Sequence, residues 1–271
     1  MRTYINKAAL AAVLALFATQ AFAQAGPQVI NIPLSRPGEP IELDISILSA
    51  RIEVIGEDRE DATFEVAVEE GARKIITPSG TQSLKNAAFS LEVQEKDNRI
   101  SVDTDWRAKK VNVVARVPRQ ANLELSTVNN GEIIVSNITG KLVLENVNGP
   151  ITASNINGSV IAEAVNQDIS VSFASLDTSQ AMSFSSVNGD LKLGLPASAG
   201  VELHIDSQEG EIYSDYEVEV QPSEPEVIRE DGPGGVEVKV KNVIVATING
   251  GGPIVRLKTL NGNIEITKSG S

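Results

Sequence analysis

Residues 131–175 read GEIIVSNIT GKLVLENVN GPITASNIN GSVIAEAVN QDISVSFAS, which are five consecutive units of nine residues with no insertion or deletion between them. The units share the pattern G-x-Φ-x-Φ-x-N-Φ-polar, where Φ is an apolar residue. The third, fifth and eighth residues are apolar in every unit. A fixed period of this kind is the signature of a repeat architecture, in which each unit extends the same core.

Each unit predicts a short strand followed by a bend. The third and fifth residues alternate with more polar ones, as in a half-buried strand, but the eighth residue breaks this parity. A bend near the seventh residue must therefore return the chain to the core. Asparagine tolerates left-handed backbone and can bond to its counterpart in a stacked coil, and glycine opens the next unit. We expect structural turns at Asn137, Asn146, Asn155, Gly131, Gly140, Gly149, Gly158, Gly189 and Gly262. Gln167 stands where the other units have glycine, so left-handed geometry is in doubt at that turn.

The sixth residues indicate how the units are arranged. They are Ser136, Glu145, Ser154, Glu163 and Ser172, which is an 18-residue alternation laid over the nine-residue one. Two nine-residue sides per coil would stack the serines on one face and the glutamates on the other. The sequence therefore predicts an all-β fold, a right-handed parallel β-solenoid with nine-residue half-coils. Asn-Gly pairs, which recur through the repeats, are also a strong hairpin signal, so an antiparallel β meander is the alternative.

The rest of the chain divides around Pro118. Residues 28–117 contain alternating strand patterns without the nine-residue period, and we predict an N-terminal β-rich half or cap over residues 24–118. The repeat region is predicted over residues 119–267, with interruptions. Within it, residues 217–235 hold six acidic residues and one arginine among several prolines and glycines. This composition predicts a mobile acidic loop.

The N-terminus predicts export. Arg2 and Lys7 precede and border an apolar run over residues 8–18, and Ala21-Phe22-Ala23 provides a cleavage site of small residues. These are the parts of a secretory signal peptide, which we place at residues 1–23. The apolar run is too short to span a bilayer core of about 30 Å comfortably. We therefore expect an exported protein, periplasmic or secreted to the cell surface, with no transmembrane segment in the mature chain.

Composition excludes several classes of chemistry. The 271 residues include no cysteine and one histidine, so disulfides, thiolate nucleophiles, iron–sulfur clusters and multi-histidine metal sites are excluded. The 36 acidic residues exceed the 23 basic ones, giving a formal net charge of −13. This charge repels a phosphate backbone, so no nucleic-acid partner is expected. We predict no cofactor and no metal site.

Three segments carry a resemblance to a known family. They are residues 117–133, which include Val117-Pro118-Arg119 and a strand ending in Asn129-Asn130-Gly131, then residues 208–215, and the terminal residues 250–264. The chain, from about residue 29 to 267, resembles a bacterial family of exported β-strand-repeat domains of unknown function, labelled putative adhesins. The resemblance implies a β-repeat fold and a binding role, and it implies no catalytic residues.

We therefore expect a non-catalytic cell-envelope scaffold or adhesin-like binding module, with a glycan or an envelope protein as partner. The outward sixth residues are the candidate binding positions: Ser136, Glu145, Ser154, Glu163 and Ser172. One alternative is a carbohydrate-active β-helix enzyme, because Glu145 and Glu163 would lie one strand apart, at about 4.8 Å. Another is an envelope signalling accessory protein that recognises its partner through residues 217–235.

Overall fold

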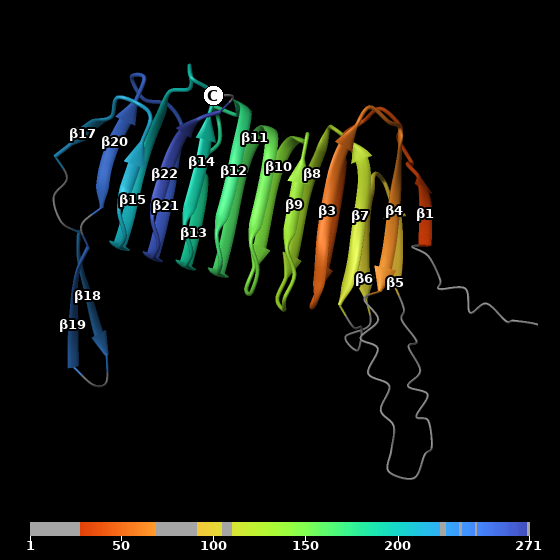
Figure 1. The fold of residues 1–271 in the computed structure, drawn as a ribbon, viewed down its shortest axis with the longest axis horizontal. Coiled ribbons are helices and arrows are strands. Elements are labelled where there is room, and N and C mark those ends of the chain that lie inside the picture. The colour runs from red at the N-terminus through yellow and green to blue at the C-terminus, as the bar shows by residue number, and fades with distance from the viewer. Residues whose placement is uncertain are drawn as a thin grey trace, which may run out of the picture.

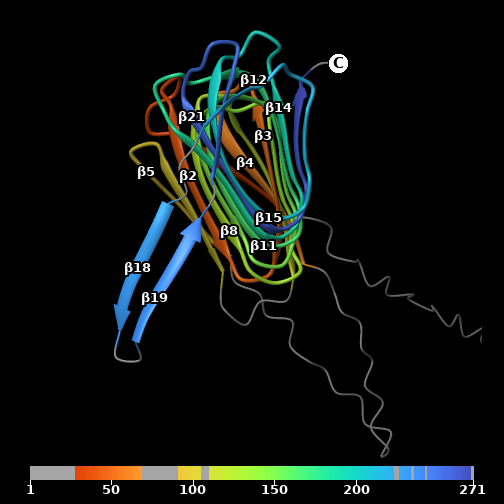
Figure 2. The same ribbon diagram turned by 90° about the vertical axis from the view of Figure 1, so that its left-hand side faces the viewer.

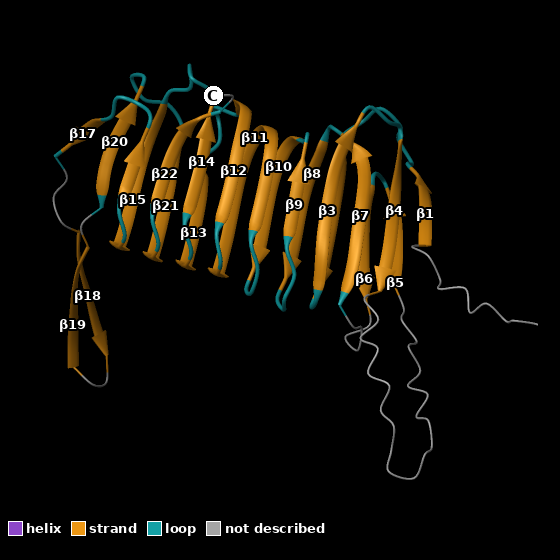
Figure 3. Ribbon diagram, viewed as in Figure 1, coloured by secondary structure: helices purple, strands orange, loops and turns teal. Residues whose placement is uncertain are grey.

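The computed structural model describes residues 28–68, 91–104, 110–222, 226–232, 235–241 and 243–269. The predicted signal peptide lies outside these residues. Within them the regular structure consists of 22 β-strands without a helix, so the prediction of an all-β fold is confirmed (Figure 3). Accordingly, the described part of the chain contains no helix of the length and hydropathy needed to cross a bilayer.

Twenty strands form one mixed sheet, which bends back so that two layers face each other across a common core (Figures 1 and 2). In spatial order, the first layer contains β5 (Leu91–Lys96), β6 (Arg99–Thr104), β2 (Ile41–Ile47), β8 (Ala121–Thr127), β10 (Thr139–Asn146), the second half of β11 (Ile151–Asn166), β13 (Met182–Asn188), β21 (Ile254–Asn261), β15 (Val201–Glu209), β20 (Ile244–Ile248) and β17 (Glu219–Gln221). The second layer contains β1 (Gln28–Pro33), β4 (Asp61–Val68), β7 (Val111–Pro118), β3 (Ala50–Glu57), β9 (Ile133–Ser136), the first half of β11, β12 (Ile169–Leu176), β14 (Leu191–Leu195), β22 (Ile264–Lys268) and β16 (Ile212–Ser214).

The nine-residue units pair in parallel with the unit two places further along the chain. Ile133 lies opposite Ile151, which in turn lies opposite Ile169, and in the other layer Leu142 lies opposite Val160. This register, two units per step, is the one predicted from the alternation of the sixth residues. The strands on either side of Asn148-Gly149, β10 and β11, are parallel neighbours, so the antiparallel meander does not describe this part of the chain.

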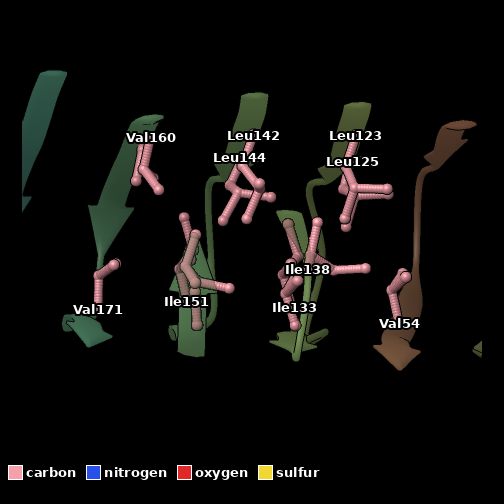
Figure 4. Close-up of a cluster of buried hydrophobic side chains, with 14 of the residues drawn as sticks. Val54, Leu123, Leu125, Ile133, Ile138, Leu142, Leu144, Ile151, Val160 and Val171 are labelled. Atoms are coloured by element: carbon pink, nitrogen blue, oxygen red, sulfur yellow. The ribbon is translucent and has the colours of Figure 1, made fainter. Parts of the chain in front are cut away.

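The core is built from the third and fifth residues of the units. All ten of these side chains in residues 131–175 are at most 2% exposed. Figure 4 shows the two layers contributing to one cluster, with Leu142 and Leu144 of the first layer facing Ile133 and Ile151 of the second. Burial of these aliphatic side chains is the main driving force for bringing the layers together.

The eighth residues do not all return to the core, which corrects the sequence prediction. Ile138 and Ile156 are fully buried, but Val165 is 38% exposed and Ala174 is also exposed. Val165 lies at the opposite edge from Ile138 and Ile156, whereas Ala174 shares their edge, where Phe173 stands in register with Ile156 and is buried in its place. At the edge of Val165 the preceding residue, Ala164, points into the core instead.

Two of the three asparagines expected at the bends have left-handed backbone. Asn137 and Asn155 have left-handed φ values of 59° and 55°, and the Nδ2 of Asn155 donates to the Oδ1 of Asn137 at 2.7 Å. Asn146 differs from them, because it does not have a positive φ and is only 2% exposed. Its amide donates to the carbonyls of Gly131 and Pro150 at 3.1 and 3.2 Å, so it ties the turn together from inside.

The glycines allow close approach between neighbouring turns. A Cβ on Gly149 would lie 1.6 Å from the carbonyl oxygen of Gly131, far inside any permitted contact. A Cβ added at any of five other glycines would lie 1.7 to 2.3 Å from a backbone oxygen. These are Gly131, Gly140, Gly158, Gly189 and Gly262. Gln167 adopts φ 138° although it carries a side chain, so the turn keeps a positive φ where the sequence left it in doubt.

Both ends of the sheet depart from this sequential order. At one end β2 and β3 pair with β8 and β9, from which they are distant in sequence, and on their other side with β6 and β7. At the other end β21 and β22 lie between β13–β14 and β15–β16, although they are last in the chain. Near these ends β1, β4, β5, β17 and β20 pair in antiparallel fashion, whereas β16, at one edge of the second layer, pairs in parallel with β22.

The predicted acidic loop at residues 217–235 contains regular structure. It includes β17, β18 (Glu226–Gly232) and the first residue of β19 (Gly235–Lys241), and β18 and β19 form an antiparallel hairpin. This hairpin is a separate two-stranded sheet. Paired valines such as Val227 and Val240 give it a strand pattern that the overall composition of the segment hides.

Candidate functional site

A row of polar residues follows one edge where the two layers join. Thr139, Asn157 and Ser175 are the ninth residues of alternate units and stand opposite one another in register. The hydroxyl of Ser175 donates to the Oδ1 of Asn157 at 2.8 Å, and the backbone of Asn157 donates to the carbonyl of Ile138 at 2.9 Å. Strand pairing thus fixes a line of hydrogen-bonding groups at a spacing of about 4.8 Å.

An open groove of about 540 Å³ runs along this row. Its lining is Asn122, Thr139, Gly140, Lys141, Asn157, Gly158, Ser159, Ser175, Leu176, Asp177 and Gln180. The two glycines add no side chain, so they leave space between the polar groups on either side. The groove therefore combines amides, hydroxyls, one ammonium and one carboxylate on a backbone held by the sheet.

The wall of the groove is an insertion in the repeat. Between β12 and β13 the regular period is interrupted by residues 177–181, so that Ile161 pairs with Ser183 and not with a residue two units further on. The backbone of Asp177 donates to the carbonyl of Gly158 at 2.9 Å, which fixes the insertion to the neighbouring turn. The side chain and backbone of Ser179 donate to Asp177 and lower the pKa of that carboxyl group. Asp177 is thus a carboxylate at neutral pH.

A second hollow of about 270 Å³ adjoins the groove on the first layer and shares Asn122 and Lys141 with it. Asp44 and Glu124 stand opposite each other on β2 and β8 in this hollow. Burial raises the pKa of Asp44, and the nearby charges of Glu124 and Asp103 raise it further against the opposing effect of Arg99. Arg99 itself forms an ion pair with Glu42.

The groove is suited to binding a polar ligand. Its volume lies in the range of about 300–1,000 Å³ that is usual for small-molecule sites. Its lining offers donors and acceptors from both backbone and side chains, and includes neither histidine nor an aromatic ring. Throughout the described ranges, no three histidine, aspartate or glutamate side chains are grouped in a way that could hold a metal ion.

The five predicted binding residues lie away from the groove, on the two outer surfaces. Ser136 and Ser154 are paired on the second layer, and Ser172 stands on the same layer opposite Gly194. Glu145 and Glu163 are paired on the first layer. The separation of serines from glutamates follows the alternation of the sixth residues, and the binding role of these residues remains a prediction.

The sequence prediction did not identify the groove residues as a set. Only Gly140 and Gly158 among the predicted turn positions line the groove. Two features of the sequence could have indicated the other groove residues. The ninth residue is polar in every unit, and the period is interrupted directly after Ser175. The edge to which each ninth residue belongs depends on the three-dimensional arrangement of the coils.

Comparisons with known proteins give remote structural similarity. No protein-family model matches the sequence, and no curated protein matches it. A putative cell adhesion protein from Clostridium sporogenes is 11% identical, with a TM-score of 0.45, and the match covers 90% of this chain and 100% of that one. A putative adhesin from Bacteroides fragilis is 11% identical, with a TM-score of 0.44 and coverage of 89% and 97%.

A third solved structure, a putative lipid binding protein from Parabacteroides distasonis, is 10% identical with a TM-score of 0.31, and the match covers 92% of this chain and 96% of that one. At these values the similarity assigns no activity to this chain. The relation to the β-strand-repeat family therefore remains a resemblance, carried by the three segments of the sequence that match its pattern.

Proposed function

We propose that the protein is an exported, non-catalytic binding module of the cell envelope, which holds a glycan in the groove along Thr139, Asn157 and Ser175. The groove carries this proposal. It places hydrogen-bonding groups at the regular spacing of the strands, and a carboxylate and an ammonium stand at its border. Sugars present repeated hydroxyl groups, each of which can donate and accept hydrogen bonds. The row of Thr139, Asn157 and Ser175 offers complementary donors and acceptors.

The scaffold in this proposal is a right-handed parallel β-solenoid with nine-residue half-coils, capped by residues 24–118. The regular register between successive parallel strands of each layer, two units per step, supports it. We propose a right-handed solenoid because about 98% of the crossover connections between parallel strands of one sheet are right-handed. The antiparallel strands at both ends would close the open edges of such a solenoid.

The test is a glycan array together with a pull-down from envelope extract, using the purified protein and assaying every retained ligand for cleavage. We expect saturable retention of an uncleaved glycan. In the variant Asn157→Ala with Gln180→Ala, retention should fall by at least about tenfold, which corresponds to two lost hydrogen bonds.

The matched control is Asn166→Ala, which removes a ninth-position asparagine at the opposite edge. Equal retention by the groove variant and the control would contradict the groove as the site. Cleavage of a retained polysaccharide that is lost on Glu145→Gln with Glu163→Gln would contradict the non-catalytic role. Failure of the folded protein to retain any glycan or envelope component would contradict the binding module itself.

A further inference from the structure

A single row of outward residues crosses the first layer and changes character along its length. In register from strand to strand it contains Asp44, Glu124, Val143, Ile161, Ser183, Arg256 and His204. One end carries two adjacent carboxylates, the centre is aliphatic, and the other end carries Arg256 and His204, with Lys258 beside Arg256 on β21 and with Glu202 and Asp206 beside His204 on β15. We call this the acidic-to-basic row. Figure 2 shows β2, β8, β11 and β15 along this side of the molecule.

Most charges of the acidic-to-basic row have no ion-pair partner among the described residues. Across those ranges, none of Asp44, Glu124, Arg256 and Lys258 forms a salt bridge, whereas His204 contacts Glu202 at 2.6 Å. All four of the unpaired side chains are exposed. The two carboxylates stand on neighbouring strands and repel each other, and a cation placed over them would remove that cost.

The spacing of the row is symmetrical about Ile161. Glu124 lies two strands from Ile161 on one side, and Arg256 lies two strands from it on the other. A two-fold axis parallel to the strands and passing over Ile161 would therefore place Arg256 of each copy above Glu124 of the other. Such an interface is isologous, because the same surface is used by both copies.

We propose that two copies of this chain associate through the first layer, in antiparallel orientation about an axis at Ile161, with Arg256 of each copy paired with Glu124 of the other. Val143 and Ile161 form the apolar centre, where both side chains are half-buried in the single chain. The occupant is a second copy because Arg256 and Glu124 exchange places when one copy is reversed along the stack.

The surface is large enough for a reversible dimer. Seven strands about 4.8 Å apart and five residues of about 3.3 Å each give about 500 Å² per copy. The total of about 1,000 Å² is at the lower limit of specific interfaces. We therefore expect a weak, reversible association.

A charge exchange between two variants tests the pairing by sedimentation velocity. Arg256→Glu alone and Glu124→Arg alone should each be monomeric, since each puts like charges opposite one another in its own dimer. An equimolar mixture of the two variants should form a dimer, because both cross-interface pairs are then of opposite sign. Lys192→Glu, which changes the same charge on the second layer, is the control and should dimerise as the original protein does.

Glu163 provides an independent check because it lies next to Ile161 on the proposed axis, so its two copies would face each other. Glu163→Gln should strengthen the dimer by about threefold or more. Three results would overturn the proposal: a monomeric original protein up to millimolar concentration, an Arg256→Glu variant that dimerises normally, or a mixture of the two charge variants that stays monomeric. Circular dichroism on each variant excludes misfolding as the cause.

Discussion

The strands of the middle of the molecule pair differently from the strands at its two ends. From β8 to β14 each strand pairs in parallel with the next strand of its own layer along the chain, and glycine or asparagine recurs at the turns. At the ends the paired strands are several coils apart in sequence or run antiparallel. A regular sequence period is therefore a property of sequential stacking, and it disappears where the chain has to close an edge.

The difference also explains where substitutions should be costly. In the middle, each turn lies directly on the backbone of the turn before it, so a change in one coil is transmitted to its neighbours. At the ends some turns are equally tight, since a Cβ on Gly210 would lie 2.0 Å from the carbonyl oxygen of Gly262, but others, such as the turn at Gly250, have nothing within 4 Å. The following substitutions separate these two regimes.

The largest effect is expected for Gly149→Ala. The added Cβ would lie 1.6 Å from the carbonyl oxygen of Gly131, so two coils would have to separate. We expect a loss of at least about 3 kcal/mol in the free energy of unfolding. Gly250→Ala is the matched change at the C-terminal end, where nothing lies within 4 Å and φ is 80°. It should cost about 1–2 kcal/mol for the left-handed backbone. Urea denaturation measures both, and equal losses would contradict the comparison.

The next largest effect is a difference in stability loss between two residues that both occupy the eighth position of their units. Ile156 is fully buried and Val165 is 38% exposed. We expect Ile156→Ala to lower the free energy of unfolding by about 2–5 kcal/mol. Val165→Ala should lower it by about 0.5 kcal/mol, as is usual at surface positions. Thermal unfolding monitored by circular dichroism distinguishes them, and similar losses would mean that the two edges are packed alike.

A gain in stability is expected at the one irregular turn of the middle region. Gln167 has φ 138°, a conformation that costs a residue with a side chain about 1–3 kcal/mol. Gln167→Gly should remove this strain and, after the entropy cost of glycine of about 0.5–1 kcal/mol, stabilise the fold by about 1 kcal/mol. Gln167→Ala is the control, because it keeps the Cβ and should give no gain. A destabilised glycine variant would show that the side chain of Gln167 is needed.

The smallest effect concerns Asp44, near the N-terminal end. Burial and the charges of Glu124 and Asp103 raise its pKa above the ordinary value of 3.8. Since the folded state disfavours the carboxylate, its charge destabilises the fold at neutral pH and ceases to do so below pH 3.8. Asp44→Asn should therefore stabilise the fold at pH 7 by less than about 0.5 kcal/mol, because the group is exposed. The gain should vanish in acid, when unfolding is measured at protein concentrations low enough for monomers.

The sequence predicted the strands of the middle region because both features that specify them are local. Alternation marks Ile133 and Val135 as inward, and Asn137 and Asn155 mark left-handed bends. It did not predict that Asn146 is buried or that Val165 is exposed, because the two turns of a coil share one sequence pattern but lie on opposite edges. The pairing of β13 with β21 could not be found either, since β14 to β20 separate the two strands in the chain and no periodicity links them.

The same limit applies to the candidate groove. Lys141 and the polar ninth residues are visible in the sequence, yet the groove exists because Thr139, Asn157 and Ser175 share an edge that Asn148 and Asn166 do not. Similarly, the proposed dimer surface depends on Arg256 entering the first layer between β13 and β15, although it comes near the end of the chain.

The placement of β21 and β22 has a consequence for how the molecule is assembled during synthesis. These strands are the last of the chain, yet they lie between β13–β14 and β15–β16. Residues 201–216 therefore have no permanent strand partner until residues 244–266 are available, since β15 pairs with β20 and β21 and β16 pairs with β22. The early coils can form in sequence as they emerge, whereas the C-terminal coils have to wait and then close in one step.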